Sequence, residues 1–227
     1  MNTMREDWTL KEIVEPKTGK THRLYWYKGR LCKRVPLDTP IARQLAGYAL
    51  IEKDLRSALV WLEEIDRIRG DDAALDQRGS RNSVDRQRYN LVKGLFVAAL
   101  TFYGKAFAQC EGRRVKLERR QIDPAFHETH DDAILFRNNF AAHSGAKLLE
   151  RAEVALVLPS KAKAGVMPRI YREMSQPDFM MTRKGDKSIA ELIEHVRQLP
   201  LAKIGQLSDK ILTEEVLPKG YKYWASK

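Results

Sequence analysis

Apolar residues recur every three or four positions over two long stretches in the first half of the chain, which is the spacing of amphipathic helices. The first predicted helix opens at Thr39-Pro40 and runs to about Gly70, since threonine can cap a helix and proline suits its first position. The second covers about residues 82–112. Because this second helix is apolar over a wide face, we expect it to be central in the fold.

Two further helices are predicted in the second half of the chain. One ends near Gly145 and starts either at Asp123-Pro124 or at Thr129, with Asp132 three positions later. The other opens at Ser188 and Glu191, which have the spacing of a capping box, in which each residue's side chain binds the other's backbone N–H. We expect this last helix to be interrupted at Pro200 and to stop at Pro218.

Alternation with a period of two, which is typical of strands, replaces helical spacing in two places. Leu24 and Trp26 share one face of a predicted strand, and Lys28-Gly29 supplies a tight turn after it. We therefore expect a small N-terminal β-meander. Val154, Leu156 and Leu158 alternate in the same way, and residues 166–171 follow after a turn with lysines and a glycine. We therefore expect a β-hairpin at about 152–172, with Pro168 confining its strand to an edge.

The predicted fold class is therefore mainly α, a bundle of four to five helices with a β-meander before it and a β-hairpin inserted into it. We place residues 1–37 in the meander appendage and residues 38–227 in the bundle, with the hairpin at about 152–172. A chain of 227 residues is long enough to bury a core without disulfides.

Composition argues against several classes of protein. The longest apolar stretch, residues 94–103, is about half the roughly 20 residues that a membrane-spanning helix needs. The acidic start of the chain resembles neither a secretory signal nor a transit peptide, so we expect a cytoplasmic protein with no membrane partner. Cys32 and Cys110 lie far apart, without paired histidines, so we expect reduced thiols, no structural metal and no cofactor.

The net charge of +11 is more informative. A basic surface attracts polyphosphates at long range. Basic residues cluster at 28–34, 78–88 and 113–120, and together they favour a nucleic-acid partner, although any single cluster could be a solvated face. We assign RNA binding to the third cluster, the basic connector, through Arg113, Arg114, Lys116, Arg119 and Arg120.

The candidate chemistry lies in the octapeptide Arg137-Asn138-Asn139-Phe140-Ala141-Ala142-His143-Ser144. The bare pattern, an arginine followed by a histidine after four to six residues, occurs twice in the chain, which chance alone would produce. The other match, from Arg120 to His127, contains Pro124 and crosses a predicted helix start. Only the octapeptide places both residues on one predicted helix.

On an ideal helix the octapeptide borders an apolar stripe. At about 100° per residue, Arg137 and His143 lie about 60° to either side of the stripe formed by Ala133, Phe136 and Phe140. Polar side chains at such a border need a partner surface or a ligand, because leaving them unpaired costs free energy. A purely structural role is the alternative, with an ordinary ion pair from Arg137 to Asp131 or Asp132 and with His143 near the helix end.

The octapeptide resembles the active-site signature of the HEPN superfamily, whose members are small helical bundles in toxins, abortive-infection proteins and RNA-targeting immune effectors. Residues 103–107 and the predicted hairpin are also similar to bacterial members, and the resemblance covers residues 39–217. It implies metal-independent RNA cleavage by Arg137 and His143, with Asn138 as the polar residue after the arginine. It also implies a toxin or antiviral-defence role, with a cognate antitoxin or defence-system partner.

These residue types suit RNA cleavage on chemical grounds too. The 2′-hydroxyl can attack the neighbouring phosphorus if a base, an acid and positive charge are supplied. Histidine can fill either proton role, and arginine presents a fixed fork to phosphate. Since one histidine cannot conveniently do both jobs in one step, we expect a homodimer that pairs two copies of His143 near the 124–146 helix. The products would carry a 2′,3′-cyclic phosphate and a 5′-hydroxyl.

Two functions therefore compete. The first is an endoribonuclease; the second is a non-catalytic basic helical module that binds nucleic acid or a protein partner.

Two weaker sets of candidates remain. We interpret His127 and His130 as solvated helix-start residues rather than RNA contacts. Residues 25–27, Tyr-Trp-Tyr, could stack bases, but packing of a hydrophobic hairpin on the bundle explains them better.

Overall fold

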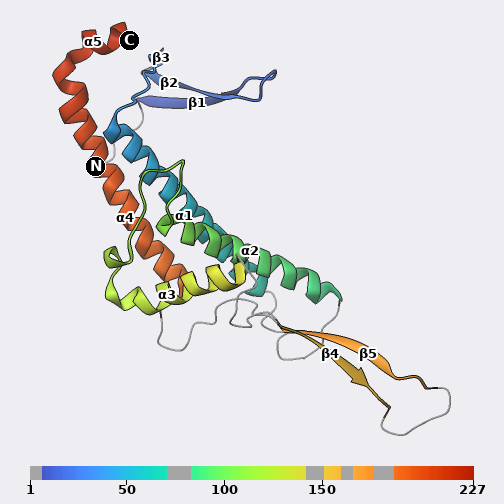
Figure 1. Cartoon of the computed structure of the whole chain (residues 1–227). Coiled ribbons are helices and arrows are strands. Elements are labelled where there is room, and N and C mark those ends of the chain that lie inside the picture. The colour runs from blue at the N-terminus through green and yellow to red at the C-terminus, as the bar shows by residue number, and fades with distance from the viewer. Residues whose placement is uncertain (1–6, 71–82, 142–150, 160–165, 176–186) are drawn as a thin grey trace. The chain divides into compact units, whose positions relative to one another are not determined.

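The computed structural model describes residues 7–70, 83–141, 151–159, 166–175 and 187–227. In chain order the elements are β1 (Trp8–Val14), β2 (Thr21–Tyr27), β3 (Arg30–Leu31), α1 (Pro40–Gly70), α2 (Ser83–Phe107), α3 (His127–Phe136), β4 (Arg151–Val157), β5 (Arg169–Ser175), α4 (Ile189–Lys210) and α5 (Gly220–Ser226) (Figure 1). The protein is mainly helical with two small antiparallel sheets, as the sequence predicts. No described helix is both long and apolar enough to cross a membrane.

The chain forms two compact units. Residues 44–206 make up one, which we call the bundle unit. Residues 1–43 and 207–227 make up the other, the terminal unit, so the C-terminal residues that the sequence places in the bundle group with the N-terminal ones. Within the terminal unit, the Lys33 ammonium donates to the Ala225 carbonyl at 2.7 Å and the Thr39 hydroxyl donates to Glu215 at 2.8 Å.

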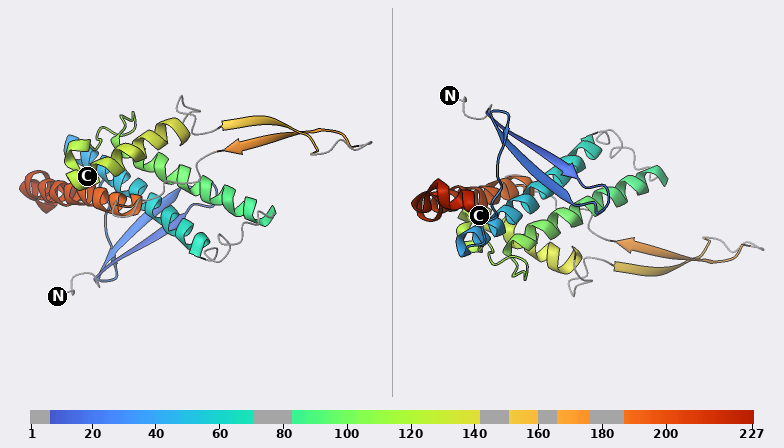
Figure 2. Two further views of the ribbon diagram at one scale, coloured as in Figure 1. Left: turned by 90° about the horizontal axis from the view of Figure 1, so that it is seen from below. Right: turned by 90° about the horizontal axis from the view of Figure 1, so that it is seen from above.

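The bundle unit has one hydrophobic core, to which α1, α2, α3 and α4 all contribute. Figures 1 and 2 show the ribbons of these four helices close together. The fully buried members of the core include Ile51, Leu55 and Ala58 of α1, Leu100 and Tyr103 of α2, Ala133 of α3, and Leu192, Ile193 and Val196 of α4. Each large apolar side chain buried here contributes roughly 1.5–3 kcal/mol to folding. The core therefore fixes α2 and α3, which carry the candidate site.

Two helix starts follow the capping residues that the sequence predicts. The Thr39 hydroxyl accepts a hydrogen bond from the Ala42 backbone N–H at 3.1 Å, which caps α1. The Asp123 carboxylate accepts one from the Ala125 N–H at 2.8 Å, and Pro124 follows it directly. This second cap opens a single 3₁₀ turn, Pro124–Phe126, before α3 begins. Each cap satisfies an N–H that the helix itself leaves unpaired.

The start of α4 is the predicted capping box. The Glu191 N–H donates to the Ser188 hydroxyl at 3.1 Å, and the Ser188 N–H donates to the Glu191 carboxylate at 2.8 Å. The prediction that Pro200 interrupts this helix is wrong, because α4 continues to Lys210 with Pro200 inside it. Pro200 is fully buried, and we attribute the tolerance of its missing N–H to that packing.

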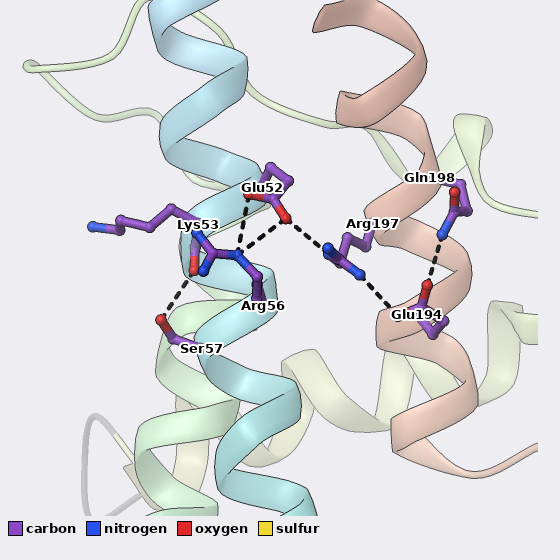
Figure 3. A network of polar contacts seen from close by, with 7 residues as sticks. All are labelled: Glu52, Lys53, Arg56, Ser57, Glu194, Arg197 and Gln198. Atoms are coloured by element: carbon purple, nitrogen blue, oxygen red, sulfur yellow. Dashed lines mark hydrogen bonds and ion pairs between the residues drawn. The ribbon is translucent and has the colours of Figure 1, made fainter. Parts of the chain in front are cut away.

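Glu52 and Arg197 join α1 to α4 beside the core (Figure 3). The Arg197 Nε donates to Glu52 at 2.9 Å, and the exposed fractions of the two side chains are 24% and 14%. Two further ion pairs extend the network. Arg56 contacts Glu52 on α1, and Glu194 contacts Arg197 on α4. Because the central pair is largely shielded from water, it is screened less than an exposed pair, and it links the two helices.

The end of α2 differs from prediction. The helix stops at Phe107 instead of near Gly112. The chain turns back there and hydrogen-bonds to the final carbonyls of the helix: the Arg113 guanidinium donates to the Lys105 carbonyl, and the Leu117 N–H donates to the Ala106 carbonyl at 2.8 Å. These groups replace the helical partners that a longer α2 would have provided.

The predicted β-meander and β-hairpin are both present. Strands β1, β2 and β3 pair in that order, and β4 pairs with β5. Lys28 and Gly29 connect β2 to β3 with positive φ angles of 48° and 75°, as a two-residue hairpin turn of type I′ requires. Leu24 and Trp26 share one face, opposite Lys11 and Thr9 of β1.

Candidate functional site

Arg137 lies directly after α3, where it begins a π-helical segment, Arg137–Ala141. Its backbone N–H still donates to the carbonyls of Ala133 and Ile134 on α3. The side chain lies against Gly104 of α2, since a β-carbon there would be 3.1 Å from Cγ and 3.2 Å from Cδ of Arg137. Glycine at this position therefore makes room for the arginine stem between the helices.

Arg137 as a whole residue is half-buried, and Asn138 is exposed beside it. The one hydrogen bond of the Arg137 guanidinium within the described residues goes to the Asn138 Oδ1, at 2.9 Å. No carboxylate of the described chain forms an ion pair with it. Asp131 is one of the two partners considered for a structural role. Its carboxylate instead accepts two hydrogen bonds from Arg119, one from Nε and one from Nη2, each at 2.7 Å. Arg137 therefore has donors left for an anion.

Over its described residues, Arg137–Ala141, the octapeptide does not continue α3 as a regular α-helix. The Asn139 side-chain amide donates to the Leu135 carbonyl at 3.0 Å. In a regular α-helix the Leu135 carbonyl would accept from a backbone N–H, and here the side chain takes that place. Side chains that compete with the backbone for a carbonyl in this way bend or widen helices. Ideal α-helical angles therefore stop applying at Arg137, and π turns of this kind occur frequently at functional sites. His143 belongs to residues 142–150, outside the described part of the chain.

A buried aspartate lies in the same unit. Asp54 of α1 is only 2% exposed, and its Oδ2 lies 3.0 Å from the Lys105 ammonium and 3.6 Å from the Arg113 guanidinium. Lys53 contacts its other oxygen at 3.2 Å. Three cations thus surround one carboxylate, and Lys105 directly follows Gly104, on which Arg137 lies. The surplus positive charge favours an anionic ligand near this part of α2.

This cluster removes Arg113 from the predicted RNA-binding set. Arg113 is only 5% exposed. Its guanidinium points inward to Asp54 and to the Lys105 carbonyl, and therefore does not face solvent. The sequence alone missed the pairing. The available signal was Asp54 itself, which lies next to Leu55 and three positions after Ile51 on the core-facing side of α1. An aspartate there needs a buried cation.

The other connector residues are exposed. Two of them are paired: Arg119 with Asp131, and Arg120 with Glu118 at 2.6 Å. Arg114 and Lys116 form no ion pair with any carboxylate in the described ranges. These two side chains therefore remain the candidates for phosphate contacts.

Searches against protein-family models, curated proteins and solved structures find no match for the chain. Within the described residues, no group of three or more His, Cys, Asp or Glu side chains is arranged to hold a metal ion. The function must therefore be inferred from Arg137 and its surroundings.

His130 is not the solvated residue that the sequence suggests. It is 5% exposed, and its Nδ1 lies 2.6 Å from the Tyr103 hydroxyl. The rings of Tyr103 and Phe107 meet it edge-on. Burial lowers the pKa of His130, since a charged imidazole would be poorly solvated there, and it raises the pKa of Tyr103. His127 is half-buried, with its Nε2 3.1 Å from the Ile122 carbonyl.

We predict that His130 makes the free energy of unfolding depend on pH. Because its folded-state pKa lies below the unfolded value of about 6.5, the unfolded chain binds the proton more tightly. The His130 contribution is therefore complete above pH 6.5 and is lost as the pH falls toward the folded-state pKa. Urea unfolding at pH 7.5 and 5.5 measures the difference, which His130→Gln should reduce. His22→Gln, at a largely exposed histidine, is the control and should not.

Proposed function

We propose that the protein is a metal-independent RNA endonuclease of the HEPN type, in which Arg137 binds the reacting phosphate. The observation that carries the proposal is the placement of this arginine. Its stem is held against Gly104, its guanidinium is oriented by Asn138, and no described carboxylate neutralises it. An arginine with a merely structural role would be expected to form an ion pair with a carboxylate such as that of Asp131.

The proposed reaction is transesterification within the RNA strand. A base removes the proton of the 2′-hydroxyl, whose oxygen bonds to phosphorus as the bond to the 5′-oxygen breaks, and an acid returns a proton to that oxygen. Arg137 stabilises the charge on the phosphorane oxygens. His143 supplies the proton transfers, and a homodimer brings two copies of it, one for each role.

The wider assignments rest on the same resemblance. They comprise a HEPN-type bundle over residues 39–217, a cytoplasmic location, and action as a toxin or antiviral-defence effector with an antitoxin or defence-system partner. Arg114 and Lys116 guide the RNA backbone without reading bases.

Cleavage of a labelled single-stranded RNA in the presence of EDTA tests the proposal. The parent protein should cut it and leave a 2′,3′-cyclic phosphate and a 5′-hydroxyl. The same strand with 2′-deoxynucleotides should resist, because the attacking group is absent. Binding without any cleavage would instead support a non-catalytic basic module.

We also predict a difference between paired and unpaired cations of the connector. Each phosphate that a cation neutralises releases counterions, so the logarithm of affinity falls with the logarithm of salt concentration by about 0.7 per contact on a single strand. Replacing Arg114 and Lys116 by Gln should therefore weaken RNA binding and flatten this slope by about 1.4 in fluorescence anisotropy titrations. Arg120→Gln, whose charge Glu118 already balances, is the matched control. An equal effect of the control would contradict the assignment.

A further inference from the structure

One face of the β1–β2–β3 sheet combines exposed aromatic rings with cations. Trp8 pairs with Tyr27 across β1 and β2, and Tyr27 pairs with Arg30 across β2 and β3. Directly paired residues point to the same side of a sheet, so these three side chains form one row on one face. Leu10 and Tyr25 form the next row of that face.

The aromatic row is open to solvent. Trp8 is 56% exposed and Tyr27 is 39% exposed. Their ring centroids lie 4.8 Å apart with planes inclined at 44°, so each ring partly covers the other and still presents surface outward. Trp26, which the sequence grouped with its neighbours as a stacking residue, lies on the opposite face and is only partly exposed. The platform is therefore Trp8 with Tyr27.

Positive charge accompanies these rings. The Lys28 ammonium lies 5.5 Å from the centroid of the Tyr27 ring, and Asp7 partly balances it at 3.3 Å. Arg30 is exposed, next to Tyr27, and forms no ion pair with the carboxylates of the described chain. The terminal unit as a whole has 14 of the chain's 41 Lys and Arg residues but only 8 of its 30 Asp and Glu residues. A polyanion is the complementary partner.

We propose that this sheet face binds single-stranded nucleic acid, with bases stacked on Trp8 and Tyr27 and phosphates held by Arg30 and Lys28. Exposed aromatic surface is unfavourable in water, so a ligand that covers these rings gains binding free energy. Unpaired bases fit because each has two flat faces, and the backbone that joins them brings one negative charge per nucleotide. Duplex bases are already stacked on each other and do not fit.

This site is separate from the proposed cleavage site. It uses neither Arg137 nor His143, and stacking does not involve the 2′-hydroxyl. Single-stranded DNA and RNA should therefore both bind to it, whereas only RNA can be cleaved by the proposed reaction. The loss of DNA binding in the Trp8 and Tyr27 variants therefore reports on the sheet without any cleavage, and it distinguishes failure of this site from failure of the nuclease.

Fluorescence anisotropy with a labelled single-stranded DNA, its RNA counterpart and a duplex tests the proposal on the full chain. Trp8→Leu and Tyr27→Leu should each weaken single-strand binding at least about fivefold, the lower end of the effect of losing one stacked base. Trp8→Phe keeps a flat ring and should retain most of the affinity. Leu31→Ala is the control, because Leu31 is 63% exposed and lies on the opposite face, beside Trp26.

Circular dichroism melts of each variant establish that the protein remains folded. Three results would overturn the proposal: unchanged affinity in both leucine variants, an equal loss in Leu31→Ala, or binding of the duplex as tight as that of the single strands. Binding of an acidic peptide in preference to both single strands would assign the face to a protein partner instead, and would equally overturn it.

Discussion

Replacing Arg137 by Ala is expected to lower the rate of RNA cleavage by roughly a hundredfold or more, the usual effect of removing one group that stabilises transition-state charge. Arg137→Lys should restore little, because an ammonium lacks the planar fork that holds two phosphate oxygens at once. Single-turnover cleavage of a labelled strand measures both. Arg67→Ala is the control, since Arg67 pairs with Glu64 on the exposed surface of α1.

The histidine of the octapeptide should behave similarly for a different reason. His143→Ala removes a group that transfers protons, and such losses lower rates by roughly a hundredfold or more. If the residues act in catalysis, the melting temperature should hardly change in either variant, and RNA affinity should hardly change in His143→Ala. Full cleavage by both variants would exclude the catalytic assignment even if the parent cuts RNA. A lowered melting temperature without parent activity would favour the structural role.

Replacing Asp54 by Ala is expected to lower the free energy of unfolding by about 3–5 kcal/mol. The substitution leaves Arg113 buried, charged and without a carboxylate, which is far less favourable than losing an exposed pair. Urea unfolding monitored by circular dichroism measures the change. Asp131→Ala is the matched control, because its partner Arg119 stays in water when the pair is lost.

A second variant distinguishes the buried charge from simple loss of packing. Replacing Asp54 by Leu and Arg113 by Met together removes both charges and keeps apolar volume. This double variant should be more stable than Asp54→Ala alone. If Asp54→Ala cost no more than Asp131→Ala, the buried pair would contribute nothing special and the interpretation of the cluster would be wrong.

Local features of the fold could be predicted from the sequence, because their causes lie within a few residues. The cap at Thr39 and the box of Ser188 with Glu191 each depend on atoms three positions apart. The turn at Lys28-Gly29 depends on two adjacent residues. Tertiary causes were not visible in this way. Pro200 is accommodated inside α4 within the packed core, and α2 ends where the returning connector satisfies its carbonyls.

The candidate site shows the same division. Residue types and spacing pointed to Arg137, whereas the room for its side chain comes from Gly104 on another helix. The π-helical turn contains a side-chain hydrogen bond from Asn139 to the Leu135 carbonyl, which helical periodicity does not predict. Arg113 was assigned to the surface because its neighbours are basic, and only its distant partner Asp54 explains why it is buried.

The return of the connector onto α2 also bears on the order in which the protein folds. Arg113 and Leu117 bind carbonyls only 8 and 11 positions earlier in the chain, and loops of about ten residues close in roughly 10–100 ns. The end of α2 can therefore form early, from local contacts alone. At that stage the charge of the Arg113 guanidinium is still hydrated, because Asp54 belongs to α1. The charge is desolvated when α1 docks against α2 and Asp54 pairs with Arg113.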